Sequence, residues 1–423
     1  MNLATAKAEQ TEAPTFRPLI PDRIEDLGIS RPLVIDLALR NIKVQGTSSL
    51  AALSNSMKVS IPVVEALYHH LRQNQLLDVE GMHGNDYSFR LTGKGRERAS
   101  EPSELGHYAG PVPVSLADYD RVTRAQVARP KVTRASIKEA FADLVVPDSM
   151  LDQLGPALIS HRSLFLYGPT GNGKTSIAER LLRIYTDNIV VPRAIEVDGH
   201  IITFFDPVVH RELAFRDDYL DPRWVACQRP CLTVGGELVS SMLELRLDDL
   251  TGVYAAPLQM KANNGILIID DFGRQVISPR ELLNRWIVPL DRRVDYLTLR
   301  HGVKFQIPFE LLVVFSTNLD PSELADEAFL RRIHTKVYIE SVTDECFDEI
   351  FRRVMARREI ACEPDSAAYL RRLSLEHSPV LRACLPIDIC DIMLSICHYE
   401  QRPAAITHAE LERAVALYFT KNI

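Results

Sequence analysis

Apolar residues recur at helical spacing in three short segments near the start of the chain, and two short runs of β-forming residues follow them. The helical pattern covers residues 32–43, 47–54 and 60–73, and the strand pattern covers residues 76–79 and 87–91. Thr47 or Ser48 can cap the second helix. Residues 21–100 are therefore predicted to form three helices followed by a β-hairpin.

The pattern changes twice along the rest of the chain. Residues 1–20 are polar, and we expect them to be flexible. Residues 101–134 contain four prolines and little periodicity, which predicts a linker that could dock on its neighbours. From residue 135 helical patterns alternate with apolar strands, as is typical of an α/β domain, and this extends to about residue 340. Residues 341–423 read as helices, with a capping box at Thr407–Glu410.

Composition narrows the class of protein. The 423 residues are 46% hydrophobic and 25% charged, which suits two or three folded domains. The net charge of −7 excludes a wholesale nucleic-acid coat but leaves a local basic patch open. No stretch approaches the roughly 18 apolar residues of a membrane-spanning helix, and an apolar signal core is missing at the start. The seven cysteines do not resemble a secreted disulfide framework. We therefore expect a cytoplasmic protein without membrane insertion.

A glycine-rich loop stands between the apolar strand 164–167 and a helical segment. It consists of Gly168, Pro169, Thr170, Gly171, Asn172, Gly173, Lys174 and Thr175, and Ser176 follows it. This is the GxxxxGK[ST] motif in the strand–loop–helix context that gives it meaning. Its backbone N–H groups would surround the β-phosphate, Lys174 would contact the β- and γ-phosphates, and the Thr175 hydroxyl would ligate Mg²⁺. The motif predicts binding of ATP with Mg²⁺.

Two adjacent carboxylates end another apolar strand, residues 265–269. Asp270 would hold Mg²⁺ through water, and Asp271 could polarise the water that attacks the γ-phosphate. Asp271 could instead be a solvated carboxylate at the end of a strand. Because aspartate reaches one methylene less far than glutamate, a nucleotide-dependent switch with little hydrolysis stays open as an alternative.

Two later features complete the pattern. The apolar strand 311–317 ends at Asn318, and Arg331 and Arg332 follow a short polar segment. With these features the chain resembles the AAA+ ATPases. The resemblance implies that Asn318 lies between two strands, the one that leads into the glycine-rich loop and the one that ends at Asp270. It also implies that Asn318 orients the attacking water. It also implies that Arg331 and Arg332 occupy the arginine-finger position and reach the nucleotide of a neighbouring subunit. Either arginine could instead form a surface salt bridge.

The resemblance also implies an architecture. It covers residues 135–423 and implies an α/β fold, with a P-loop AAA+ core that has a parallel sheet (residues 135–340) and a C-terminal helical lid (residues 341–423). The three helices and hairpin of residues 21–100 precede it, and we expect them to form a winged-helix-like N-terminal domain. Arg382 in the lid is a candidate contact to the nucleotide. Because an arginine finger acts across subunits, we expect a homo-oligomeric ring, in particular a hexamer.

Within AAA+, the chain resembles bacterial chaperone-like ATPases associated with Flp pilus assembly. The resemblance rests on residues 153–157, 164–175, 270–275, 284–290 and 315–318. Such relatives carry Pro-Arg-Asp near the lid, where this chain has Pro386-Ile387-Asp388. This chain therefore lacks the arginine of that motif.

Two hairpins are predicted inside the core. Residues 194–205 contain an Asp198-Gly199 turn, and residues 294–306 turn near His301-Gly302. Such hairpins could line the pore of a ring and grip a substrate, or they could serve only for packing within the ring.

Three helices and a hairpin form the winged-helix arrangement, and residues 91–95, Leu-Thr-Gly-Lys-Gly, also resemble that family. Residues 31–100 hold nine Lys or Arg and six Asp or Glu, a net charge of +3. However, helix 60–73 has only Arg72 as a fixed positive charge, and its first residues do not include Arg, Asn or Gln to read bases.

The leading hypothesis is therefore an ATP-hydrolysing ring ATPase that remodels or assembles a macromolecular partner. The N-terminal domain would recruit an unknown protein partner. The alternatives are a DNA-associated loader or regulator, with this domain on duplex DNA, and the switch with little hydrolysis.

Overall fold

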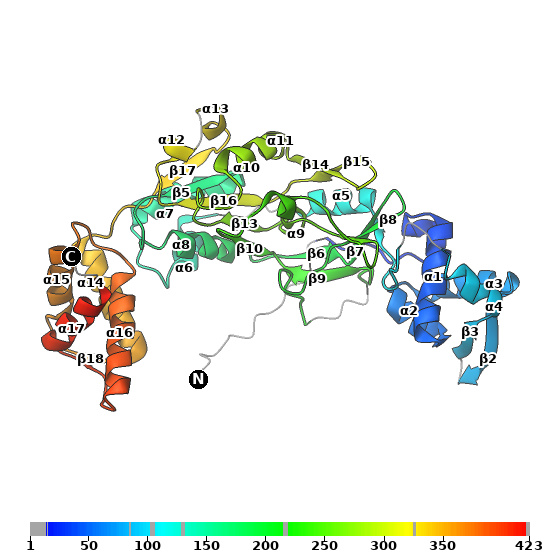
Figure 1. The fold of residues 1–423 in the computed structure, drawn as a ribbon, viewed down its shortest axis with the longest axis horizontal. Coiled ribbons are helices and arrows are strands. Elements are labelled where there is room, and N and C mark those ends of the chain that lie inside the picture. Colours follow the sequence, from blue (N-terminus) through cyan, green and yellow to red (C-terminus); the bar gives the residue numbers. More distant parts are fainter. Residues whose placement is uncertain are drawn as a thin grey trace.

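The computed structural model describes residue 14 and residues 16–83, 86–101, 106–127, 132–214, 219–324 and 327–419. Most of segment 1–20, which we expected to be flexible, lies outside these residues. The described chain is elongated, and its β-rich central part lies between an N-terminal and a C-terminal helical region (Figure 1).

The N-terminal helical region combines short helices with a three-stranded antiparallel sheet of order β1-β3-β2. Its elements are η1 (Ile24–Leu27), α1 (Arg31–Gln45), β1 (Thr47–Ser49), α2 (Leu50–Met57), α3 (Ile61–Gln73), β2 (Leu77–His83), β3 (Asp86–Leu91) and α4 (Gly93–Arg98). The three predicted helices and the two hairpin strands are confirmed. Leu37, Leu67 and Phe89 are fully buried in a core to which η1, α1, α2, α3, β2 and β3 contribute.

One prediction in this region was wrong. Thr47 and Ser48 do not cap the second helix but belong to β1, which pairs with Arg90 and Phe89 of β3. Ser49 caps α2 instead, and its hydroxyl accepts a hydrogen bond from the Ala52 N–H at 3.2 Å.

The predicted linker also differs from the structure. Residues 114–125 form β4 (Val114–Ser115) and α5 (Leu116–Ala125). β4 pairs in parallel with β7 (Ala194–Val197), and the buried Tyr119 and Val122 anchor α5 in the central part. The sequence pattern did not reveal these two elements, because their partners lie in distant parts of the chain.

The main sheet of the central part has five parallel strands in the order β10-β13-β16-β5-β17. Their bounds are β5 (Leu164–Tyr167), β10 (Cys231–Val234), β13 (Ile266–Ile269), β16 (Leu312–Thr317) and β17 (Thr335–Tyr338). Successive side chains of β5 point to opposite faces, so Leu166 joins one buried cluster and Phe165 joins the other. Both faces are therefore covered, as the apolar composition of these strands requires. The predicted α/β fold with a parallel sheet is confirmed.

Short helices cover this sheet. They are α6 (Arg134–Ala140), α7 (Asp148–Ser160), α8 (Lys174–Arg180), η2 (Leu181–Ile184), α10 (Pro279–Arg285), α11 (Ile287–Arg292), α12 (Pro321–Leu324) and α13 (Glu327–Leu330). Ile177 of α8 and Leu154 of α7 pack on one face, and Trp286 and Leu282 pack on the other.

A second β-rich layer lies between the main sheet and the N-terminal region (Figure 1). Its elements are β6 (Asn188–Pro192), β7, β8 (His200–Thr203), β9 (Trp224–Gln228), η3 (Ser240–Leu243), β11 (Arg246–Asp248), β12 (Val253–Ala255), α9 (Leu258–Lys261), β14 (Val294–Thr298) and β15 (Lys304–Pro308). Both predicted hairpins, β7–β8 and β14–β15, are confirmed. Asp198 and Gly199 have φ values of 50° and 82°, which suits the tight turn between β7 and β8.

The C-terminal helical region (Asp344–Tyr418) stands at the other end of the molecule from the N-terminal region (Figure 1). It contains α14 (Asp344–Arg358), β18 (Ala361–Cys362), α15 (Ser366–His377), α16 (Leu385–Tyr399), β19 (Ala405–Ile406) and α17 (His408–Tyr418). Phe347, Leu370 and Leu411 lie in a core of its own. The predicted capping box of Thr407 and Glu410 opens α17. Among the described residues, no helix has the length and apolar character needed to cross a membrane.

Arg223, which forms a buried ion pair within the central part, also joins the central part to the N-terminal region. The Arg223 guanidinium lies 2.8 Å from the Asp221 carboxylate, and the two side chains are 4% and 2% exposed. Arg223 also donates hydrogen bonds to the carbonyl oxygens of Leu27, at 2.8 Å, and Pro113, at 3.3 Å. One side chain thus connects three segments that are far apart in the sequence.

We expect Arg223→Ala to lower the free energy of unfolding by about 3–5 kcal/mol, because it leaves the Asp221 carboxylate buried and unpaired. Urea unfolding followed by tryptophan fluorescence would measure this, since the buried Trp224 is adjacent. The matched control is Arg300→Ala. Its ion pair with Asp249 is exposed, so we expect a loss of about 0–1 kcal/mol. Equal losses in the two variants would contradict the assignment of Arg223 as a structural hub.

Candidate nucleotide site

The phosphate loop, residues 168–175, connects the carboxyl end of β5 to the first turn of α8. Gly168 has φ 139°, and a Cβ atom there would lie 2.2 Å from the carbonyl oxygen of Ile339. No other residue type fits so close to β17 and the chain that follows it. Gly173 is the N-cap of α8, so the backbone amides that open this helix face into the loop. Thr170 lies exposed at the tip of the loop.

Lys174 is buried inside the loop, with 7% of its surface exposed. Its Nζ donates hydrogen bonds to the carbonyl oxygens of Gly168 and Pro169, both at 2.9 Å. Burial lowers the pKa of this ammonium group, and the carboxylates of Asp270 and Asp271 oppose that effect. The loop therefore holds a poorly solvated positive charge at the position where the motif predicts phosphate.

Thr175 and Asp270 come together across the carboxyl edge of the sheet. The Thr175 hydroxyl donates a hydrogen bond to the Asp270 carboxylate at 2.8 Å. A hydroxyl and a carboxylate oxygen at this separation are ligands that suit Mg²⁺, which usually keeps several waters and binds one or two protein groups beside substrate phosphates. The two residues predicted to share the metal therefore fit it.

Asn318 lies beside Asp271. The strand that precedes it, β16, is hydrogen-bonded to β13 on one side and β5 on the other, which confirms its predicted place between them. The Asn318 Nδ2 group donates to the Asp271 carboxylate at 3.3 Å. These two side chains form a polar pair at the sheet edge, next to Thr175 and Asp270.

The backbone around Asp271 is strained. Asp271 has φ 48°, in the left-handed region that few residues other than glycine adopt. The turn is fixed by a hydrogen bond from the Phe272 N–H to the Ser316 carbonyl at 2.7 Å. Gln275 adds a second clamp, because its amide donates to the Asp270 carbonyl and accepts from the Gly273 N–H. The sequence motif did not reveal this role of Gln275, which depends on the turn geometry.

A cavity of about 460 Å³ opens next to the phosphate loop. Gly171, Asn172, Gly173 and Ser176 line it from the loop, and the C-terminal helical region closes it from the other side. Apolar side chains form much of the wall, including Val146, Met150, Ile177, Ile350, Val354 and Ile387. An apolar pocket beside a phosphate-binding loop suits a flat heterocyclic base.

The residues expected from the C-terminal region are only partly at this cavity. Ile387, at the position where the resemblance predicts an arginine, lines the wall with an apolar side chain. Arg382 is not among the lining residues, although a Cβ atom at Gly171 would lie 3.4 Å from its Cδ. Arg353, which the sequence did not single out, donates hydrogen bonds to the carbonyl oxygens of Ala142 and Leu144 at 3.0 and 3.2 Å.

The two candidate finger arginines differ clearly. Arg332 forms an ion pair with Asp291 at 2.9 Å, and its side chain is 21% exposed. Arg331 is exposed, and within the described ranges no hydrogen bond or ion pair engages its side chain. Neither arginine lines the cavity at the loop of its own chain.

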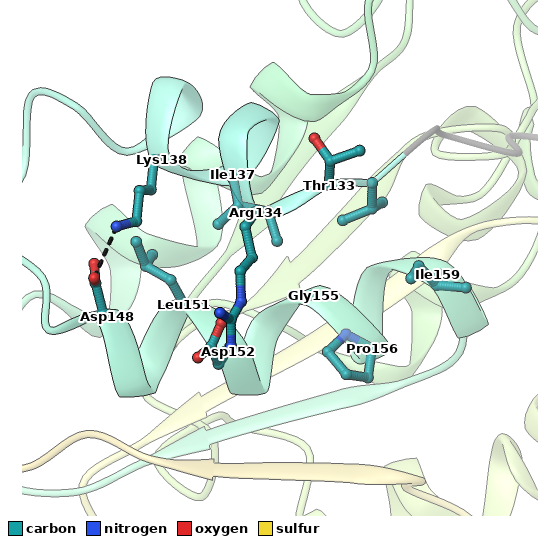
Figure 2. A pocket seen from close by; sticks show the side chains of 11 residues that line it. Thr133, Arg134, Ile137, Lys138, Asp148, Leu151, Asp152, Gly155, Pro156 and Ile159 are labelled. Carbon is teal, nitrogen blue, oxygen red and sulfur yellow. Dashed lines mark hydrogen bonds and ion pairs between the residues drawn. The ribbon is translucent and has the colours of Figure 1, made fainter.

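A second hollow, of about 310 Å³, lies between α6 and α7. Figure 2 shows Lys138 and Asp148 paired at one end of it, at 2.7 Å, and Arg134 paired with Asp152 at 2.8 Å. No residue of the phosphate loop and no predicted site residue lines it. The candidate nucleotide site is therefore the cavity beside the loop.

Comparison with known proteins gave three results. Residues 343–417 match a family model described as a domain of unknown function (DUF8689), and no curated protein matches the chain. Among solved structures, this chain is similar to the RuvB Holliday junction branch migration motor of Thermotoga maritima. The two are 13% identical, the similarity covers 69% of this chain and 72% of that chain, and the TM-score is 0.37. This chain is also similar to NtrX from Brucella abortus, with 13% identity, 68% and 60% coverage, and a TM-score of 0.43.

The left-handed backbone at Asp271 makes a prediction about stability. Asparagine tolerates this conformation, whereas alanine does so at a cost of about 1 kcal/mol or more. We therefore expect Asp271→Ala to unfold with a free energy about 1 kcal/mol lower than Asp271→Asn, although both lose the charge. Urea unfolding of the two purified variants measures the difference. Equal stabilities would show that the turn relaxes to another conformation.

Proposed function

We propose that this protein is an AAA+ ATPase that hydrolyses ATP to ADP and phosphate. The observation that carries the proposal is the convergence of Thr175, Asp270 and Asn318 at one edge of a parallel sheet. The strand of Asn318 lies between the strand that leads into the phosphate loop and the strand that ends at Asp270. This is the order that the AAA+ resemblance implies.

Each residue then has a chemical task. The loop amides and Lys174 bind the phosphates of ATP. Thr175 and Asp270 would hold Mg²⁺, which would supply positive charge beside the phosphates. Asp271 polarises a water molecule, and Asn318 holds both Asp271 and that water in place. The water oxygen bonds to the γ-phosphorus and gives up a proton to Asp271, while the bond to the bridging oxygen breaks, which gives ADP and phosphate.

We propose a homo-oligomeric ring, in particular a hexamer, because Arg331 is exposed and does not line the cavity of its own chain. Such an arginine can act on the nucleotide of an adjacent subunit. We assign the finger to Arg331, since the guanidinium of Arg332 is already engaged by Asp291. Arg332 then has the structural role of a salt bridge.

The N-terminal region is proposed to recruit a protein partner. The exposed side of α3 presents Ile61, Glu65 and His69, and the neighbouring hairpin exposes Met82 and Tyr87. Such a surface offers apolar contact area and few cations for DNA phosphates. Remodelling of that partner in the cytoplasm, in connection with Flp pilus assembly, is the setting that the family resemblance implies.

The first test separates binding from turnover. We expect Lys174→Ala to abolish binding of a fluorescent ATP analogue, because the loop loses its only buried cation. Asp271→Asn should retain binding within about threefold and lower phosphate release by at least about 100-fold, because the general base is lost. Nucleotide binding with no phosphate release in the wild-type ring would instead indicate a switch with little hydrolysis.

The second test concerns the finger. We expect Arg331→Ala to lower phosphate release by about 10³-fold or more while nucleotide binding is retained. Arg332→Ala, the matched control, should keep turnover within about tenfold of wild type, since it loses an ion pair on the surface.

Mixing of subunits sharpens this test. Asp271→Asn subunits cannot hydrolyse ATP but carry an intact Arg331, so they should restore turnover when mixed with Arg331→Ala subunits. A mixture as inactive as its two components would contradict a finger that acts across subunits.

A further inference from the structure

The C-terminal helical region is hydrogen-bonded directly to the phosphate loop. The Cys384 N–H donates to the Gly171 carbonyl at 2.9 Å, and the Ala383 N–H donates to the Asn172 side-chain oxygen at 3.2 Å. Asn172 is only 6% exposed, so its amide is committed to these internal contacts. Two adjacent backbone amides of the C-terminal region thus end on two adjacent residues of the loop.

The contact is close. Gly171 has φ 81°, and a Cβ atom at this position would lie 2.8 Å from the Cys384 sulfur. A side chain therefore cannot be placed between the loop and the C-terminal region. Helix α16, of 15 residues, begins at Leu385, the residue after Cys384. A displacement of the loop at Gly171 would therefore move the first residues of α16 or break this contact.

Asn172 also connects this contact to Lys174. Its Nδ2 group donates to the Pro169 carbonyl at 3.4 Å, and the same carbonyl accepts from the Lys174 ammonium group at 2.9 Å. When phosphate oxygens bind Lys174, they compete with the Pro169 carbonyl for the ammonium protons. Asn172 therefore bonds both to the segment of the loop that responds to phosphate and to the C-terminal region.

We propose that Asn172 is a positioning residue that latches the C-terminal region to the phosphate loop and transmits the state of the loop to α16. This rests on the proposed function in one respect, namely that nucleotide is the ligand that changes the loop. The latch itself needs no nucleotide, because all its donors and acceptors belong to the chain. Arg353, which holds α14 to Ala142 and Leu144, supplies a second contact between the C-terminal region and the central part at the same cavity.

The test uses the full-length protein and two variants of one side chain. Asn172→Ala removes the acceptor for the Ala383 N–H, whereas Asn172→Asp keeps an oxygen at that position. Hydrogen–deuterium exchange is measured without nucleotide on peptides that cover residues 380–390. We expect exchange to be about fivefold faster in Asn172→Ala, as the loss of one hydrogen bond of ordinary strength implies, and close to wild type in Asn172→Asp. Peptides from β5 and α7 should be unchanged in both variants.

A kinetic readout then separates positioning from a general loss of structure. We expect Asn172→Ala to lower kcat of ATP hydrolysis by about fivefold or more, with KM within about twofold, because the phosphate-binding amides and Lys174 are retained. Adding ADP should slow exchange at residues 380–390 in the wild type and do so less in Asn172→Ala.

The outcomes are distinct. Wild-type exchange in Asn172→Ala, or equally fast exchange in Asn172→Asp, would overturn the latch. The same holds for an unchanged kcat in Asn172→Ala. If the wild type neither binds nor hydrolyses ATP, the proposed function fails, but the nucleotide-free exchange measurement still decides whether the latch exists.

Discussion

The hydrogen bond between Thr175 and Asp270 joins segments that follow two non-adjacent strands of the main sheet, and the rest of the site depends on how these segments meet. The two residues follow β5 and β13, which are not neighbours, because β16 lies between them. Strands separated by one intervening strand are roughly 10 Å apart, so the segments after β5 and β13 must bend toward each other over the end of β16. That strand accordingly ends in the small polar residues Ser316 and Thr317, both buried. The Thr317 hydroxyl donates to the Phe272 carbonyl at 2.7 Å and so helps to hold the bend.

Packing below the edge maintains this arrangement. Phe272 follows the strained Asp271 and is buried against Phe315 of β16, with ring centroids 5.0 Å apart. Phe165 of β5 lies 6.0 Å from Phe272 and 5.9 Å from Phe315. Aromatic contacts and buried area of this kind outweigh a left-handed residue that costs about 1–2 kcal/mol. The hydrophobic core thus holds the backbone that follows Asp271, whose own side chain is exposed beside Asn318.

The sequence predicted the features that depend on residues close together in the chain, and it missed those that depend on partners far away in the chain. The phosphate loop and the two hairpins are local patterns, and each lies where it was predicted. The choice between Arg331 and Arg332 was open because it depends on Asp291, 41 positions away. The same reason explains the errors: β1 exists only because β3 lies beside it, and β4 only because β7 does. The roles of Arg353 and Gln275 could not be identified either, since their partners at the site are backbone groups that no side-chain pattern marks.

Helix α5, which lies in the segment predicted to be a linker, connects the N-terminal region to the main sheet. Tyr119 of α5 accepts a hydrogen bond from the Asn263 side chain at 2.7 Å, and Asn263 also accepts from the Glu310 N–H at 2.8 Å. Asn263 stands just before β13 and Glu310 just before β16, so one buried amide ties α5 to the starts of both strands that carry Asp270 and Asn318. On its other side α5 follows β4, next to the Pro113 carbonyl that Arg223 binds. Buried hydrogen bonds therefore connect the N-terminal region, through Arg223 and α5, to the two strands that lead to Asp270 and Asn318.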